Sequence, residues 1–169
     1  MVSIDALLQR RSIRRYTKEA VDEDSVHYIL RAAMSAPSAG NERPWHFITI
    51  KDRASLDQIS AFQPHSNMLK EAPMAILVCG DESLEKYNGF LPQDCAAAME
   101  NMLIAACSKG LGSVWLGIFP VKERMDPMRK HMGLPANVFP FALMALGHSN
   151  EEKPTNSRFD ASRVHEERW

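Results

Sequence analysis

Basic and hydroxyl side chains gather in one short segment near the start of the sequence. Residues 10–16 read Arg-Arg-Ser-Ile-Arg-Arg-Tyr. Guanidinium groups and a hydroxyl donate several hydrogen bonds in a geometry that suits a phosphate dianion. The same residues also suit a solvated helix end, because cations there complement the helix dipole. Taken alone, the segment leaves both a phosphate site and a solvated basic surface open.

Two later segments combine glycine with polar residues. Residues 36–45 read Ala-Pro-Ser-Ala-Gly-Asn-Glu-Arg-Pro-Trp, so two prolines bracket a polar loop. A loop held in a fixed shape offers backbone and amide groups to a polyol or to the edge of a heterocycle. Residues 110–118 place glycines at both ends of an expected strand, which lets a flat ligand approach the backbone closely. Each segment is equally compatible with an ordinary turn, or with a helix cap and a bulge.

Other chemistry is poorly supported. The sequence has no GxxxxGK[ST], HExxH or GxSxG motif, and its six histidines are scattered without the spacing of metal ligands. The Gly-Leu-Gly at residues 110–112 follows an expected helix and leads into a strand, which is the reverse of a dinucleotide-binding loop. We therefore expect no metal site. Late in the chain, Arg158 is either a further phosphate ligand or an exposed arginine of the tail.

Hydrophobic periodicity and helix-ending residues predict the elements that must position these groups. Helices are expected over residues 4–10, 23–35, 56–61, 93–109 and 121–132. Strands are expected over residues 45–50, 74–79, 113–118 and 141–146. Pro127 is expected to lie in the first turn of the fifth helix or to break it.

Two features suggest a second subunit. The helix over residues 93–109 is apolar on most sides, so it should be buried on most sides, which is hard to achieve within 169 residues. Residues 148–169 are rich in charge yet carry Phe159, Val164 and Trp169. We expect an extended C-terminal arm that docks on a partner; a frayed tail is the alternative.

Size, charge and cysteine content set the general class. A chain of 169 residues without repeats or a long linker suits a single domain. The net charge of −1 argues against a dedicated nucleic-acid binder. There is no apolar run of membrane-spanning length and no secretory signal, so no membrane association is expected. Three cysteines, an odd number in apolar surroundings, indicate reduced thiols in a cytoplasmic protein.

The four chemical segments, in this order, resemble the nitroreductase family of FMN-dependent oxidoreductases. The resemblance rests on RRSIRRY, APSAGNERPWHF, GLGSVWLG and GHSNEEKP with the later RFD, and it spans nearly the whole chain. It implies one compact domain over residues 1–169. It implies an α+β fold, with helices flanking a mixed, mainly antiparallel sheet. It further implies a homodimer that exchanges C-terminal arms and holds FMN at the subunit interface.

The resemblance also implies roles for individual residues. Phosphate contacts fall on Arg10, Arg11, Ser12 and Arg158. Arg14 matches a cation near the flavin pyrimidine edge, where it would stabilise negative charge on reduced flavin. The loop that lines the flavin from the other subunit matches Pro37, Ser38, Ala39 and Asn41. The strand beside the flavin ring matches Leu116, Gly117 and Ile118.

Three positions fit the pattern less closely. Ser66 or Asn67 only approximates an amide near the ribityl chain. Arg43 stands where many members have glutamine, and Asn156 stands where some have a lysine. Arg11 could replace the cation lost at Asn156.

The implied activity is reduction of a small-molecule acceptor, such as a nitroaromatic compound or a quinone, by NADH or NADPH in a ping-pong cycle. The flavin would carry the chemistry, so no catalytic side chain is assigned. One alternative is an FMN-binding protein of the same fold that lacks NAD(P)H reductase activity or performs dehalogenation or ring fragmentation. Another is a non-enzymatic module whose arginines at 10–15 meet an acidic partner or nucleic acid.

Overall fold

The computed structural model describes residues 4–155 and 158–169 and shows a sheet with helices on both faces. The strands are β1 (Trp45–Ile50), β2 (Met74–Asp81), β3 (Gly112–Gly117) and β4 (Val138–Gly147). They lie in the order β1-β2-β4-β3, and all of these pairings are antiparallel. The parallel component is a single bridge between Ser12 and Ser113. The predicted α+β fold with a mainly antiparallel sheet is therefore confirmed.

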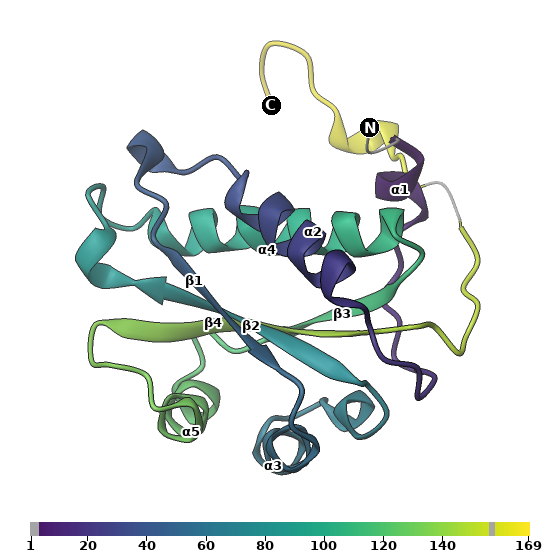
Figure 1. Cartoon of the computed structure of the whole chain (residues 1–169). Helices are drawn as coiled ribbons and strands as arrows, with labels where there is room; N and C mark the ends of the chain where they lie inside the picture. The colour runs from purple at the N-terminus through teal and green to yellow at the C-terminus, as the bar shows by residue number, and fades with distance from the viewer. Residues whose placement is uncertain (1–3, 156–157) are drawn as a thin grey trace.

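The helices divide between the two faces of the sheet. They are α1 (Ile4–Gln9), α2 (Glu23–Met34), α3 (Arg53–Phe62), α4 (Leu91–Ser108) and α5 (Lys122–Met132). Figure 1 shows α2 and α4 on one face and α3 and α5 on the other. Covered on both sides, the central strands β2 and β4 are buried along their whole lengths, which explains their continuous apolar sequences.

Helix starts are fixed by local chemistry. Asp22 and Asp52 cap α2 and α3, each accepting the backbone N–H three residues further on. Short 3₁₀ turns complete the chain at Ala39–Asn41, Asn67–Lys70, Glu82–Leu84 and Ala161–Arg163. Among the described helices, none is long and apolar enough to cross a bilayer.

The helix α4 is covered within one chain more fully than its sequence suggested. It packs on the sheet, on α2 and on α1. The half-exposed residues of α4 include a stripe at helical spacing, comprising Ala96, Ala97, Glu100, Ile104 and Cys107. This stripe is the part of the helix that a second subunit could cover.

Two prolines behave differently from what the sequence suggests. The expectation that Pro127 lies in a first turn or breaks the helix was wrong, because it lies inside α5 and the helix continues to Met132. Met128, the next residue, is fully buried, and this burial offsets the missing backbone hydrogen bond. β4 starts three residues before the expected strand and so includes Pro140, which pairs with Cys79 where the β2–β4 register shifts. The bulge accommodates a residue that has no N–H to donate.

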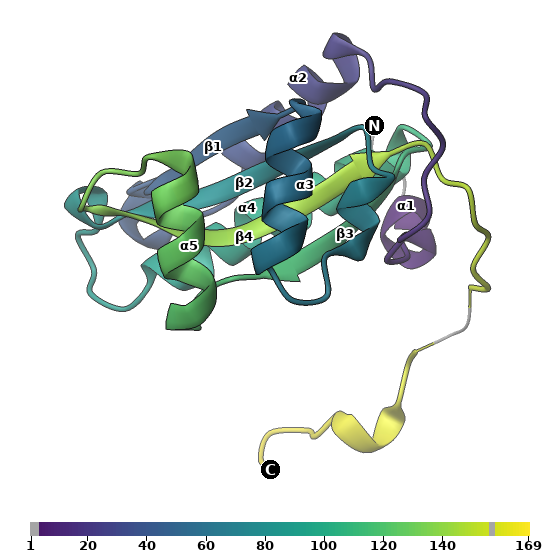
Figure 2. The same ribbon diagram turned by 90° about the horizontal axis from the view of Figure 1, so that it is seen from below.

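The C-terminal arm has two parts. Up to Pro154 it runs along the segment that follows α1: Tyr16 bridges Ser149, and Asn150 N donates to Arg15 O at 2.9 Å. Residues 158–169 extend away from the sheet in Figure 2. Their large apolar side chains are exposed, with Phe159 at 78% and Trp169 fully open. These side chains are therefore little covered within a single chain.

Candidate functional site

The basic segment is placed by the end of α1 and the start of β3. Arg10 N donates to Ala6 O at the last turn of α1, and Ile13 N donates to Ser113 O at 2.9 Å. The chain thus passes beside the first residues of β3. This arrangement holds Arg10 and Arg11 beside Cys107, near the C-terminal end of α4.

Two adjoining cavities open at this place and share Arg10 and Arg11. The smaller, of about 230 Å³, is also lined by Cys107, Gly112, Ser113, Ser149 and Lys153. The larger, of about 570 Å³, is also lined by Leu7, Leu8, Glu100, Thr155, Arg158 and Phe159. The structure therefore brings Arg158 to the same cavity as Arg10 and Arg11.

The charge of this hollow is strongly positive. Arg10 is held 3.5 Å from Glu100, while Arg11 donates to backbone carbonyls of Leu8, Arg10 and Pro154. Carbonyls orient a guanidinium without neutralising it. Burial raises the pKa of the Cys107 thiol, and the charges of Arg10 and Arg11 oppose that rise. The positive field therefore reaches into the smaller cavity.

Lys153 is a further cation that the sequence analysis did not single out. Its Nζ donates to Ser12 O at 2.7 Å and lies 3.3 Å from the Glu151 carboxylate. The signal in the sequence was its place between Glu152 and Pro154, five residues before Arg158. Its hydrogen-bond partner Ser12 is 141 positions away in the sequence, so only the folded chain shows that Lys153 lies beside the N-terminal segment.

Ser12 and Arg14 differ in how far they are buried. Ser12 is half-buried beside Ser113. Arg14 is exposed, its backbone N–H donates to Glu151 Oε1 at 2.5 Å, and its side chain lies 3.4 Å from Ser12 O. Burial raises the pKa of Glu151, but the hydrogen bonds from Arg14 N and Lys153 prevail and lower it. Glu151 is thus an anion that holds this segment in place.

The loop with Pro37, Ser38, Ala39 and Asn41 lies at the opposite end of α4. Ala39 N donates to Asp94 Oδ1 at 3.1 Å, in the first turn of that helix. Asp94 and Cys107 are 13 positions apart, which is about 20 Å along the axis of an α-helix. One chain therefore does not bring this loop to the arginines.

Leu116 and Gly117 end β3, and Ile118 follows directly. Leu116 and Ile118 are buried, whereas a Cβ added at Gly117 would meet no atom within 4 Å. The Gly117 carbonyl accepts from Gln63 Nε2 and from Arg124 Nη1, both at 3.0 Å. Gln63 and Arg124 were not predicted from the sequence. They fix the strand end and leave its backbone open on one side, where a flat ligand can lie.

The other approximate positions are also placed. Ser66 is buried, donating to the Gln63 carbonyl, and Asn67 begins a 3₁₀ turn. Arg43 has a positive φ of 48° and its N–H donates to the Ser38 hydroxyl at 3.0 Å, which stabilises the loop. Asn156 lies outside the described residues.

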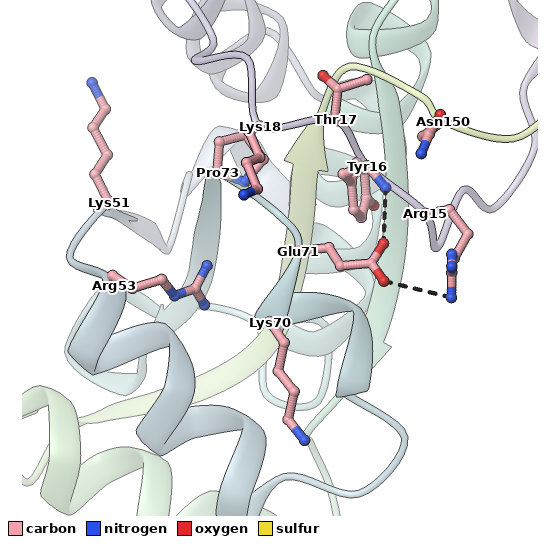
Figure 3. Close-up of a pocket in the computed structure, with 10 residues that line it drawn as sticks. All are labelled: Arg15, Tyr16, Thr17, Lys18, Lys51, Arg53, Lys70, Glu71, Pro73 and Asn150. Carbon is pink, nitrogen blue, oxygen red and sulfur yellow. Dashed lines mark hydrogen bonds and ion pairs between the residues drawn. The ribbon is translucent and has the colours of Figure 1, made fainter.

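A separate groove of about 670 Å³ contains none of the predicted site residues. Its lining includes Arg15, Lys18, Lys51, Arg53 and Lys70 (Figure 3). Several of these cations already have partners within the chain: Arg15 pairs with Glu71, and the Arg53 guanidinium donates to Ala72 O and Leu69 O. In Figure 3 Lys51 and Lys70 point away from each other. The cations therefore do not converge on one point.

Comparisons with known proteins agree with the fold. The sequence model of the Nitroreductase family matches residues 7–63 and 63–148. A protein of Methanothermobacter thermautotrophicus, named as a candidate NADH dehydrogenase/NAD(P)H nitroreductase, is 45% identical over 166 residues, spanning 98% of this chain and 87% of that protein. The crystal structure of a candidate NADH oxidase from Clostridium acetobutylicum has a TM-score of 0.95 and 42% identity, with 98% of this chain and 100% of that one covered.

A third relative was crystallised with a flavin. The structure of a candidate nitroreductase from Desulfovibrio desulfuricans in complex with FMN has a TM-score of 0.84 and 33% identity, covering 98% of this chain and 96% of that one. The match of the family model covers far more than half of the sequence. These findings agree with the resemblance carried by the four segments. The chain belongs to the nitroreductase family.

Proposed function

We propose that this protein is an FMN-dependent oxidoreductase that takes electrons from NADH or NADPH and passes them to a small-molecule acceptor. The observation that carries the proposal is the positive hollow at the end of α1, built from Arg10, Arg11 and Arg158 with Lys153 beside it. A relative that is 33% identical binds FMN, and a 45% identical relative is named for NAD(P)H and nitro-group chemistry.

The residues present suit the phosphate of FMN. A dianion prefers several guanidinium and hydroxyl donors around it, and the hollow offers three arginines with Ser12 next to them. Arg10 and Arg11 would hold the phosphate, and Arg158 would close over it from the arm. Arg14 would lie toward the pyrimidine edge.

The backbone at Gly117 suits the flat part of the same molecule. No atom stands within 4 Å of the position where a Cβ would be, so a ring can pack against the strand end. Gln63 and Arg124 would keep this peptide from shifting through their bonds to its carbonyl. Bound FMN would supply hydride acceptance and donation, so this chain's residues would only bind and orient it.

The proposed site is completed by a second copy of the chain. The loop at residues 37–41 lies about 20 Å along α4 from the arginines. A two-fold dimer through the half-exposed stripe of α4 would bring the loop of one copy near the arginines of the other. The arm at residues 158–169 would then lie on the partner subunit, which would bury the side chains of Phe159 and Trp169.

The activity is tested by anaerobic addition of NADH, then NADPH, to protein loaded with FMN, while the visible flavin spectrum is recorded. Bleaching by either nucleotide, reversed by a quinone or nitroaromatic compound, is the expected result and names the donor. A flavin spectrum that neither nucleotide bleaches would contradict the reductase and favour another flavin reaction on the same fold.

A further inference from the structure

Two buried carboxyl groups meet where the 37–41 loop joins α4. Glu42 is 8% exposed and Asp94 is 5% exposed. Glu42 follows the loop directly, and Asp94 lies in the first turn of α4. Burying two ionised carboxyl groups side by side is unfavourable, because each charge loses its hydration.

Each acid uses one oxygen to hold backbone. Asp94 Oδ1 accepts the Ala39 N–H at 3.1 Å. Glu42 Oε2 accepts the N–H groups of Lys86 and Tyr87 at 2.6 and 3.2 Å. The pair thus joins the loop, the turn at residues 85–87 and the helix.

The remaining oxygen of each acid, Glu42 Oε1 and Asp94 Oδ2, is buried without a hydrogen-bond partner among the described residues. No basic side chain of that part of the chain is paired with either acid. The two carboxyl groups are close enough to interact. A proton shared between them would satisfy both unpartnered oxygens, since a protonated acid donates and an ionised acid accepts.

The electrostatics agree with that arrangement. The pKa of Asp94 is raised above its ordinary value of 3.8 chiefly by burial; the Ala39 N–H opposes the rise, and the neighbouring Glu42 carboxyl adds to it. Other titratable groups facing Asp94 are Glu85, whose charge adds to the rise, and Cys95, a buried thiol. Neither supplies a positive charge. Two cations adjoin Glu42, namely Arg43, the next residue, and Lys86, whose backbone N–H donates to Glu42, but among the described residues no ion pair joins either of them to Glu42 or Asp94.

We propose that Glu42 and Asp94 are positioning residues that share one proton and thereby hold the 37–41 loop in the shape that lines the flavin. The proposal rests on the proposed function for the role of the loop. Gly40 shows how closely that shape is defined: a Cβ there would lie 2.2 Å from the Tyr87 ring. When the shared proton is lost, both buried carboxyl groups are charged and repel each other. This repulsion weakens the attachment of the loop to α4 through Ala39 N–H and Asp94.

The test compares amide and alanine substitutions. Asp94→Asn keeps an acceptor for Ala39 N–H and gives a permanent donor toward Glu42, and Glu42→Gln does the same in the other direction. Asp94→Ala removes both the acceptor for Ala39 N–H and the group that interacts with Glu42. The matched control is Asp81→Asn, because the buried Asp81 carboxylate accepts from Ser83 and Asn137 and has no facing acid.

Melting temperature is measured across about pH 4 to pH 9, which spans the ordinary and raised range of a carboxyl group. The parent should lose stability as the pH rises above 3.8 through the raised pKa of Asp94. Asp94→Asn and Glu42→Gln should abolish that loss and match or exceed the parent at the upper end. Asp94→Ala and the control Asp81→Asn should melt lower than the parent.

FMN affinity gives the second readout. Asp94→Asn should bind FMN within about twofold of the parent, whereas Asp94→Ala should bind about tenfold more weakly, since an unmade buried hydrogen bond costs about that factor. Equal losses of melting temperature in Asp94→Asn and Asp94→Ala would overturn the shared proton. A parent protein that binds no FMN would overturn the proposed function instead, and the melting series would still decide the shared proton.

Discussion

Arg10 is the side chain on which the phosphate assignment depends most. It lines both cavities at the end of α1, and its side chain is only 19% exposed, so its position is well defined. Arg10→Ala should weaken FMN binding by about tenfold to a hundredfold, because it removes a charge-assisted hydrogen bond. Fluorescence titration of apoprotein with FMN measures this.

The matched control is Arg129→Ala on α5. Its guanidinium donates to the carbonyls of Pro135 and Ala136, far from the hollow. Its removal should leave FMN affinity unchanged. Equal affinities for the parent and Arg10→Ala would remove Arg10 from the site.

Asp81 is a second residue with a defined electrostatic role. Burial opposes its charge, but hydrogen bonds from Ser83, Asn137 and His46 prevail and lower its pKa to about 2. Its contribution to stability is therefore present above pH 3.8 and is lost as the pH falls from 3.8 toward 2. Asp81→Asn should flatten this acid limb of a stability–pH curve. An unchanged acid limb would show that these hydrogen bonds do not stabilise the charge.

For single residues, the sequence indicated which side chains could bind an anion better than it indicated which groups those side chains contact. The run at residues 10–16 and Arg158 pointed to an anion site, and the fold brings Arg10, Arg11 and Arg158 to one cavity. Lys153, Gln63 and Glu42 gave no comparable signal. Each acts through a backbone group of a distant segment, and such a contact exists only once the chain has folded.

The strand β3 offers a matched pair of glycines. A Cβ at Gly112 would lie 2.7 Å from Ile13 Cγ2, whereas a Cβ at Gly117 would meet nothing within 4 Å. Gly112→Ala should lower the free energy of unfolding by about 1–3 kcal/mol through overpacking. Gly117→Ala should leave stability nearly unchanged and weaken FMN binding, because the methyl group occupies space proposed for the ring.

Chemical denaturation and FMN titration of both variants check this pair. The open side of Gly117 would lose its proposed role if Gly117→Ala bound FMN as tightly as the parent. A Gly112→Ala protein as stable as the parent would mean that Ile13 moves aside at little cost.

The pattern of apolar residues predicted correctly which segments form helices and which form strands. It predicted less accurately the residues at which these elements begin and end. The five helices and four strands were all expected within a few residues, because apolar spacing reflects the face that each element buries. Pro127 and Pro140 caused the main differences. Local rules treat proline as a break, but burial of Met128 and a bulge in the β2–β4 ladder accommodate these two.

At the scale of the whole molecule, the outer arm should stabilise a dimer rather than the single chain. Phe159, Val164 and Trp169 are between 60% and 101% exposed, so they contribute little to the fold of one chain. Replacing all three by serine should weaken dimerisation by about tenfold or more, since burying such side chains stabilises by about 1.5–3 kcal/mol each. Sedimentation velocity at decreasing concentration measures this.

Leu84→Ser is the control for that experiment, because Leu84 is also an exposed large hydrophobic residue, at 40%, but lies outside the arm and α4. It should not change the dimerisation constant. A triple variant that dimerises as well as the parent would mean that the arm does not dock on a second copy.

The sequence suggested a second subunit but could not show on which surface it would dock. The apolar helix at residues 93–109 suggested an interface, yet most of its surface is covered by the sheet, α2 and α1. Only the folded chain shows which stripe of α4 remains open. The separation of the 37–41 loop from the arginines also emerges only in three dimensions.

The central claim is that two copies of this chain together build the FMN site. Native mass spectrometry of the protein after incubation with excess FMN tests it most directly. We predict a dimer that carries one FMN per chain, with no FMN on any residual monomer. A monomer that holds FMN by itself, or a dimer that takes up none, would contradict the account.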